Sequence, residues 1–280
     1  MPIELPPWTI FTKAISLIWE KRLFALYISF PFILFHTLLG VGLDLGILPP
    51  AAALGAEQGA GSRSLSGYAA GLAVLLIFGF LLCVIAVYWH RSILLGEHPV
   101  GGIPVRFAGP VWRYILYFVG IFVVILLLFI VLTTVFGMLT IFLAGPGAGA
   151  AFAIVLILLL AWLGYVSFRF SLVLPAAAIG MPNFGFRVAW ATSRGYAWRL
   201  VAILLLMFGL SIAIGIIWAV FVLVGGLPVA ALYESLPKSL TLTLEAVLYA
   251  AQTLISIGVL SLTFAYLTYE GPRAGAVARK

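Results

Sequence analysis

Three ionisable residues lie inside long apolar stretches of the sequence, where charged side chains are rare and are often functional. They are His36, Arg169 and Glu245. Within a membrane, an imidazole can ligate a haem or a pigment, a guanidinium can bind a phosphate group, and a carboxylate can bind a proton or a cation. Each residue also has a structural alternative, in which its side chain only links neighbouring helices, and we favour that alternative for all three.

Arg169 is the sharpest of these three candidates. It lies about one and a half helical turns before Pro175, near the end of an apolar stretch. Its side chain can extend to a lipid phosphate, or it can pair with Glu97 or Glu270, which follow comparable stretches. The sequence therefore predicts that Arg169 is engaged by an anionic group.

Motifs of familiar catalytic sites are missing from the sequence. It contains no His-Glu-x-x-His, no Gly-x-Ser-x-Gly and no phosphate-binding glycine loop with lysine. His90 is expected at the end of a span, too far in depth from His36 to ligate the same haem. Glu245 has no second carboxylate at helical spacing, although Gln252 follows on roughly the same face. We predict no catalytic residue, no metal site, no cofactor and no enzymatic activity.

Composition indicates the class of protein. Of the 280 residues, 65% are hydrophobic and 8% are charged, which excludes an ordinary soluble enzyme. The net charge of +7 does not indicate nucleic-acid binding, because the basic residues lie between apolar runs and line no polar face. The single cysteine, Cys83, allows no disulfide within the chain.

Six stretches are apolar for the roughly 20 residues that a membrane-crossing helix needs. They cover about residues 22–41, 67–89, 114–143, 148–174, 200–225 and 242–266. None alternates as a barrel strand does, so we predict an all-α, six-span transmembrane bundle. The first 21 residues contain no cleavage site for a signal peptidase. We expect one transmembrane domain over residues 1–271 and a basic cytoplasmic tail over 272–280.

The basic residues are distributed unequally between the two predicted sides of the membrane. Thirteen of the 15 fall on the side of the amino terminus, and only Arg63 and Lys238 fall on the other. The positive-inside rule then predicts a bacterial inner-membrane protein with both termini in the cytoplasm. The residues predicted to meet lipid headgroups, or to be polar groups within the membrane, are Arg91, Arg169, Arg187, Arg194 and Arg199.

Two segments before apolar stretches have the pattern of helices that lie in the membrane interface. In the first, one predicted face carries the apolar residues Trp8, Phe11, Ile15, Ile18 and Trp19. In the second, Asn183 is the expected cap and Phe186 and Trp190 share a face. We predict three parallel repeats, about 1–99, 100–182 and 183–271, each an interfacial helix followed by a two-span hairpin.

The stretch from Arg169 to Pro175, followed by Asn183 to Arg199, resembles a bacterial membrane-protein pattern. It is similar to the six-span membrane domain of some glycerophosphodiester phosphodiesterases, and to stand-alone inner-membrane proteins of the YciC type. The sequence departs from that pattern because residues 176–183 contain no acidic residue, and because no phosphodiesterase domain follows the last span. The resemblance therefore implies a fold but no reaction.

These features favour a non-enzymatic membrane protein that engages lipid or serves as an accessory or assembly component of a membrane complex. Its expected partners are membrane lipids, together with a larger complex or further copies of itself. A transporter or flippase for a lipid or small amphiphile is the alternative, and it would need a polar cavity at mid-membrane. An intramembrane enzyme is a third class, which the missing motifs disfavour.

Overall fold

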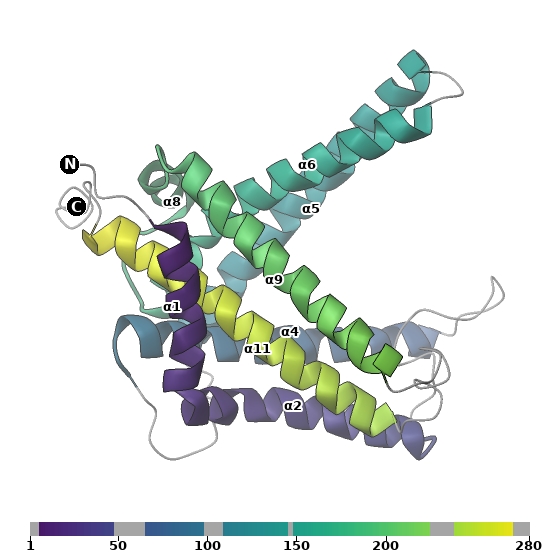
Figure 1. Ribbon diagram of the computed structural model, residues 1–280, viewed down its shortest axis with the longest axis vertical. Helices are drawn as coiled ribbons and strands as arrows, with labels where there is room; N and C mark the ends of the chain where they lie inside the picture. The colour runs from purple at the N-terminus through teal and green to yellow at the C-terminus, as the bar shows by residue number, and fades with distance from the viewer. Residues whose placement is uncertain (1–5, 48–64, 98–108, 145–147, 225–237, 271–280) are drawn as a thin grey trace. The chain divides into compact units, whose positions relative to one another are not determined.

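The computed structural model describes residues 6–47, 65–97, 109–144, 148–224 and 238–270, and within these ranges the chain is helical with no strand (Figure 1). This confirms the predicted all-α class. The α-helices are α1 (Pro7–Glu20), α2 (Arg22–Asp44), α4 (Leu65–Leu94), α5 (Gly109–Ala144), α6 (Ala148–Ser171), α7 (Val173–Ala178), α8 (Phe186–Thr192), α9 (Ala197–Val224) and α11 (Lys238–Ala265). A π-helical turn, Tyr266–Glu270, continues α11.

Six segments among the described residues are long and apolar enough to cross a membrane. They lie in α2, α4, α5, the α6–α7 pair, α9 and α11. The chain is therefore a multi-pass membrane protein, and the predicted six-span helical fold is confirmed. Most helices extend beyond the predicted apolar stretches, as α5 does by beginning at Gly109. The three-repeat organisation stays a prediction.

The break between α6 and α7 follows from one proline. Pro175 has no N–H to bond the carbonyl four residues earlier, which belongs to Ser171, and its ring clashes with that carbonyl. Accordingly α6 ends at Ser171, and Pro175 occupies the first turn of α7. Gly180, at φ +74°, then ends α7, with Met181 N bonding Ala176 O at 2.9 Å. All six side chains of α7 are buried.

The helices fall into two compact units, and the first contains residues 1–10, 108–206 and 260–280. In it α5 packs against α6 and α7, and α6 packs against α8. Phe186 of α8 contacts both Tyr117 and Phe170, with ring centroids 5.4 and 5.6 Å apart, respectively. Aromatic side chains thus fix α8 to the α5–α6 hairpin.

The second unit contains residues 11–107 and 207–259, and its part of α11 contacts four other helices. The contact pairs are Ala14 with Gly258, Thr37 with Thr243, Phe78 with Tyr249, and Ser211 with Gln252. α11 is also the least apolar of the six spans, with mean hydropathy 1.7, and the most buried, at 56%. A helix with polar groups is thus shielded by more apolar helices, as expected inside a membrane.

Candidate functional site

α1 carries two separate apolar faces, where the sequence predicted one. Because each helical residue turns by about 100°, Ile10, Ala14 and Leu17 share one face, and the structure buries all three. The second face is the exposed apolar stripe of α1, formed by Trp8, Ile15 and Trp19, whose exposed fractions are 64, 40 and 74%. Phe11 was predicted to lie with this stripe, but it is buried.

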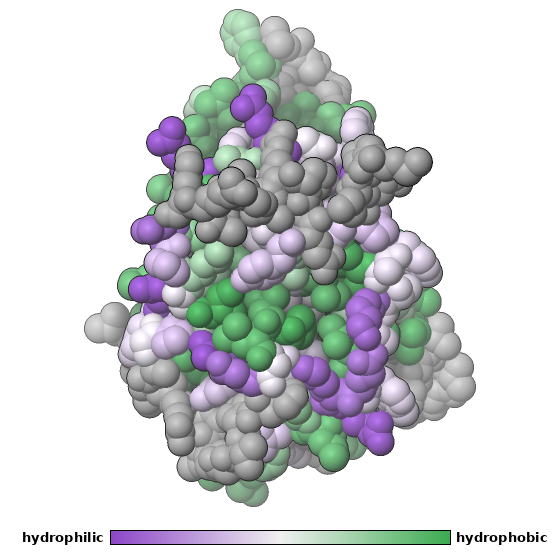
Figure 2. Space-filling model, turned by 90° about the vertical axis from the view of Figure 1, so that its left-hand side faces the viewer, coloured by the Kyte–Doolittle hydropathy of each residue, from purple (hydrophilic) through white to green (hydrophobic). Residues whose placement is uncertain are grey.

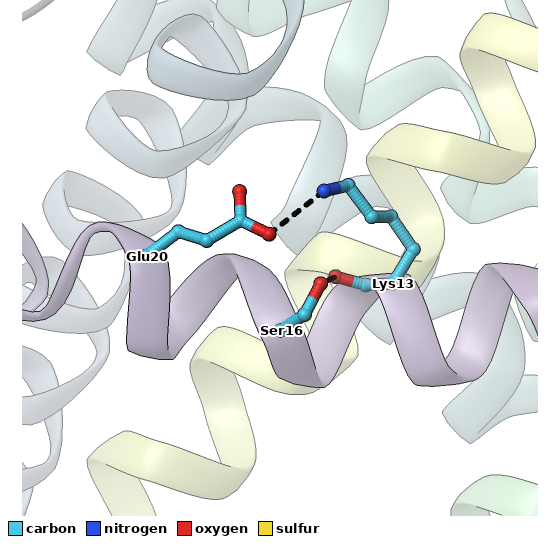
Figure 3. Close-up of polar contacts among 3 residues, drawn as sticks. All are labelled: Lys13, Ser16 and Glu20. Carbon is cyan, nitrogen blue, oxygen red and sulfur yellow. Dashed lines mark hydrogen bonds and ion pairs between the residues drawn. The ribbon is translucent and has the colours of Figure 1, made fainter.

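The third face of α1 is polar (Figure 3). Lys13 Nζ lies 2.8 Å from Glu20 Oε1, and Ser16 Oγ donates to the Lys13 carbonyl at 2.9 Å. The hydrogen bond from Lys13 is the largest influence on Glu20 and lowers the pKa of its carboxyl. A helix with a buried face, an exposed apolar face and a polar face is suited to lie at a membrane surface against its own protein.

Two basic residues make polar contacts at the end of α4, and one of them ties α1 and α2 to it. Lys21, between α1 and α2, donates from Nζ to Ser92 O at 2.7 Å and to Ser92 Oγ at 2.9 Å. Burial lowers the pKa of Lys21. Arg91 makes a two-pronged ion pair with Glu97, through Nε and Nη2 at 2.8 Å each. Glu97 is thus the partner of Arg91, and lipid binding by Arg91 stays a prediction.

Arg169 is buried at the end of α6, with 6% of its surface exposed. Its Nε donates to Ser193 Oγ at 2.8 Å, Nη1 to Tyr165 Oη at 3.2 Å, and Nη2 to the Trp190 carbonyl at 2.6 Å. The guanidinium carbon also lies 3.5 Å from the centroid of the Trp190 ring. Every one of these partners is electrically neutral. Among the described side chains, the guanidinium therefore joins α6 to α8 through neutral groups, and its engagement by an anionic group stays a prediction.

Ser193 is itself held in place. Its Oγ bonds the carbonyls of Ala189 and Trp190 at 2.9 and 3.1 Å, and the residue is fully buried. Sequence reasoning missed Ser193 and Trp190 as partners of Arg169, because it searched for acidic side chains. The stretch Trp-Ala-Thr-Ser could have indicated these partners, because it places a ring, a carbonyl and a hydroxyl within one helical turn.

The remaining arginines of this region are at the surface or partly so. Arg187 and Arg194 are exposed, and Arg199 lies over the Tyr196 ring at 5.8 Å. The prediction that Asn183 caps α8 is wrong. Gly185 occupies the N-cap position, and no side chain caps the helix. Asn183 instead adopts φ +62°, a left-handed turn conformation that asparagine tolerates. The predicted shared face of Phe186 and Trp190 is present, since both contact Phe170.

His36 lies among aromatic rings within the span of α2. Its ring centroid is 4.4 Å from that of Phe32, 5.6 Å from Phe35 and 5.3 Å from Phe78. Nδ1 is 3.0 Å from the Phe32 carbonyl, which can only accept, so Nδ1 carries the proton. This arrangement fits the helix-packing role that we favoured. Among the described residues, no three His, Cys, Asp or Glu side chains form a group that could hold a metal ion.

Polar side chains on α11 lie near the predicted site Glu245. Glu245, which is half-buried, and Gln252 lie at a seven-residue spacing on one face of the helix. Gln252 Nε2 donates to Ser211 Oγ of α9 at 2.6 Å. On another face, Thr243 bonds Thr37 of α2 at 2.8 Å. These bonds join spans to one another, as polar groups inside membranes commonly do.

The face drawn in Figure 2 carries hydrophilic residues beside exposed hydrophobic ones, the mixture expected where a protein meets headgroups and acyl chains together.

Comparisons with protein-family models, with curated proteins and with solved structures found no match to this chain. Its function is therefore inferred from its own residues and contacts.

Proposed function

We propose that this chain is a non-enzymatic protein of the bacterial inner membrane that engages lipid through helices lying in the cytoplasmic interface. Both termini are cytoplasmic in this proposal, as the distribution of basic residues predicts. In the same proposal, the chain can act as an accessory or assembly component of a larger membrane complex. It is also compatible with the resemblance to the membrane domain of glycerophosphodiester phosphodiesterases, which implies no reaction.

The observation that carries the proposal is the exposed apolar stripe of α1. Tryptophan is enriched at membrane interfaces, because its ring is apolar and its N–H is polar. Trp8 and Trp19 are the two ends of this stripe, and both are more than 60% exposed although the neighbouring face of α1 is buried. Arg22 lies 5.3 Å from the Trp19 ring and brings positive charge to the same end of the helix.

Spin labels test this placement directly. Cys83 is replaced by alanine, and a nitroxide is attached to a single cysteine at position 8, 15 or 19, with Thr9 and Lys13 as matched positions on the polar face. In lipid nanodiscs, labels on the stripe should collide mainly with oxygen, which partitions into lipid, and labels at 9 and 13 mainly with a water-soluble nickel complex. Equal access of all five labels to the nickel complex would refute the interfacial placement.

Purification separates lipid engagement from an assembly role. The full chain is extracted in mild detergent, and the retained lipids and proteins are identified by mass spectrometry. A retained lipid without a stoichiometric protein supports lipid engagement, and a stoichiometric protein supports an assembly component. Recovery of neither under gentle extraction would contradict the proposal.

The transporter or flippase alternative has one favourable observation, which is the hydrogen bond between Gln252 and Ser211 inside two spans. Ser211 is exposed in the isolated chain although it lies in a span. For this alternative, proteoliposomes should move a fluorescent phospholipid between leaflets faster than protein-free vesicles do. Gln252→Leu should abolish that excess rate, whereas Ser256→Ala on the same helix should leave most of it. A rate equal to that of empty vesicles rejects the alternative.

A further inference from the structure

The guanidinium of Arg169 has unused hydrogen-bonding capacity in a buried position. Arginine has five N–H groups, and three are accounted for by Ser193, Tyr165 and Trp190. Two N–H groups, one on Nη1 and one on Nη2, therefore have no acceptor among the described residues. With 6% of Arg169 exposed, bulk water cannot solvate the group as it would a surface arginine.

The charge of Arg169 also has no ion-pair partner among the side chains that the structure describes. The ion pairs of Lys13 with Glu20 and of Arg91 with Glu97 do not involve Arg169. Between Glu97 and Glu234 the sequence contains six arginines and no aspartate or glutamate. A buried charge is strongly unfavourable unless it is paired, and neutral acceptors do not cancel it. A partner from outside this stretch is therefore expected.

Trp190 and Ser193 hold the guanidinium of Arg169 in one orientation. The Trp190 ring covers one side of its plane at 3.5 Å, and Ser193, which is fully buried and bonded to two carbonyls, fixes Nε. A guanidinium fixed in this way can present two N–H groups to one anion, the arrangement that phosphate oxygens accept well. A lysine in the same place would offer one point charge and no such fork.

We propose that the two remaining N–H groups of Arg169 bind the oxygens of a phosphate group. The inference rests on the proposed function, because a lipid headgroup is the phosphate most abundant where a span ends. Arg169 lies two residues before the end of α6, in a span that continues through α7 to Ala178, and its partner helix α8 is followed by Trp198. Trp190 and Trp198, at 40 and 82% exposed, are side chains typical of the membrane interface. Arg194, exposed just after Ser193, adds positive charge.

The test uses the delipidated full chain in detergent. Native mass spectrometry follows titration with phosphatidylglycerol, and a separate arm adds inorganic phosphate and measures the shift in melting temperature. The variants are Arg169→Gln and Arg169→Lys, and the control is Arg187→Gln, which removes the same charge from an exposed position on α8. We expect the wild type to bind one phosphatidylglycerol, Arg169→Gln to bind it at least tenfold more weakly, and Arg187→Gln to differ less than threefold.

The two arms identify the source of the phosphate. Binding of phosphatidylglycerol that depends on Arg169 supports a lipid source, and a thermal shift with inorganic phosphate that depends on Arg169 supports a free phosphate. Equal binding by Arg169→Gln and Arg187→Gln in both arms overturns the proposal. The proposal is also overturned if the wild type binds neither probe. This outcome does not depend on whether any variant folds. The spin-label test of α1 involves none of these residues, so the failure of one proposal is distinguishable from failure of the other.

Discussion

Arg169 and Trp190 contact each other in two ways at once. The guanidinium carbon lies 3.5 Å from the centroid of the Trp190 ring, and Nη2 donates to the carbonyl of the same residue at 2.6 Å. The ring contact depends on the side chain, but the hydrogen bond does not. Substitution of Trp190 therefore separates the two contributions, whereas substitution of Arg169 removes both.

Trp190→Leu should destabilise the protein by about 2 kcal/mol, because a desolvated cation–π contact is lost while the carbonyl remains as an acceptor. Reversible unfolding in mixed micelles measures the change. The matched control is Trp198→Leu, since Trp198 is 82% exposed and should cost little. Equal effects of the two substitutions would mean that the ring over Arg169 contributes nothing specific.

Gly258 permits the close approach of α1 and α11. A Cβ atom at this position would lie 3.3 Å from Ala14 Cβ and 3.6 Å from Trp89 Nε1. Gly258→Leu should therefore cost about 1–3 kcal/mol by overpacking and should increase proteolysis within α1. Gly209→Leu in α9 is the control, because nothing lies within 4 Å of the added atom. The packing would be looser than described if both variants melted at the wild-type temperature.

Thr37 and Thr243 should be energetically coupled across α2 and α11. Their hydroxyls are 2.8 Å apart, and each also lies within hydrogen-bond distance of a carbonyl of its own helix. Because a hydroxyl has one proton, one threonine donates to the other, which donates to its own carbonyl. Thr→Val keeps the shape of the side chain, so a double-mutant cycle isolates the bond between the helices. We expect a coupling energy of about 0.6 kcal/mol, the average for such bonds in membranes. Strictly additive single substitutions would show that the pair contributes no stability.

The ion pair on α1 should be sensitive to acid. The pKa of Glu20 is lowered in the folded protein, chiefly by the hydrogen bond from Lys13. Its stabilising contribution is thus present above the ordinary glutamate pKa of 4.5 and is lost as the pH falls through the lowered value. Lys13→Gln should raise the pKa of Glu20 towards 4.5, as measured by carboxyl NMR titration. Ser16 also lowers the pKa of Glu20, but by less than Lys13 does, so Ser16→Ala should raise it less. A larger effect of Ser16→Ala than of Lys13→Gln would contradict this prediction.

The six spans could be predicted from the sequence because length and apolarity alone determine whether a helix can cross a membrane. The ends of the spans were harder to predict, since helices continue into the interface past the last apolar residue. α4, for example, extends to Leu94 although the predicted stretch ended at Trp89. A rule based on hydrophobicity has no information about hydrogen bonds that form beyond the hydrocarbon layer.

The partners of Arg169 could not be predicted in the same way. Ser193 and Trp190 lie 24 and 21 residues further along the chain, and only the fold of α7 and the following turn brings them back. The buried face of α1 was missed for a different reason. Its central residue is Ala14, which lies between Ile10 and Leu17 and contributes little to a hydrophobic pattern, and the contact of Ala14 with Gly258 depends on the absence of a side chain.

The polar character of α11 has a consequence for biosynthesis. This helix leaves the ribosome after α1, α2, α4 and α9, the four helices that its residues contact. Because it is the least apolar span, it enters lipid alone less readily than the others do. The earlier helices can receive its hydroxyl and amide groups as it emerges. Insertion of α11 is thus coupled to assembly, and a chain in which α2 and α4 have not yet paired should retain this segment in the translocon.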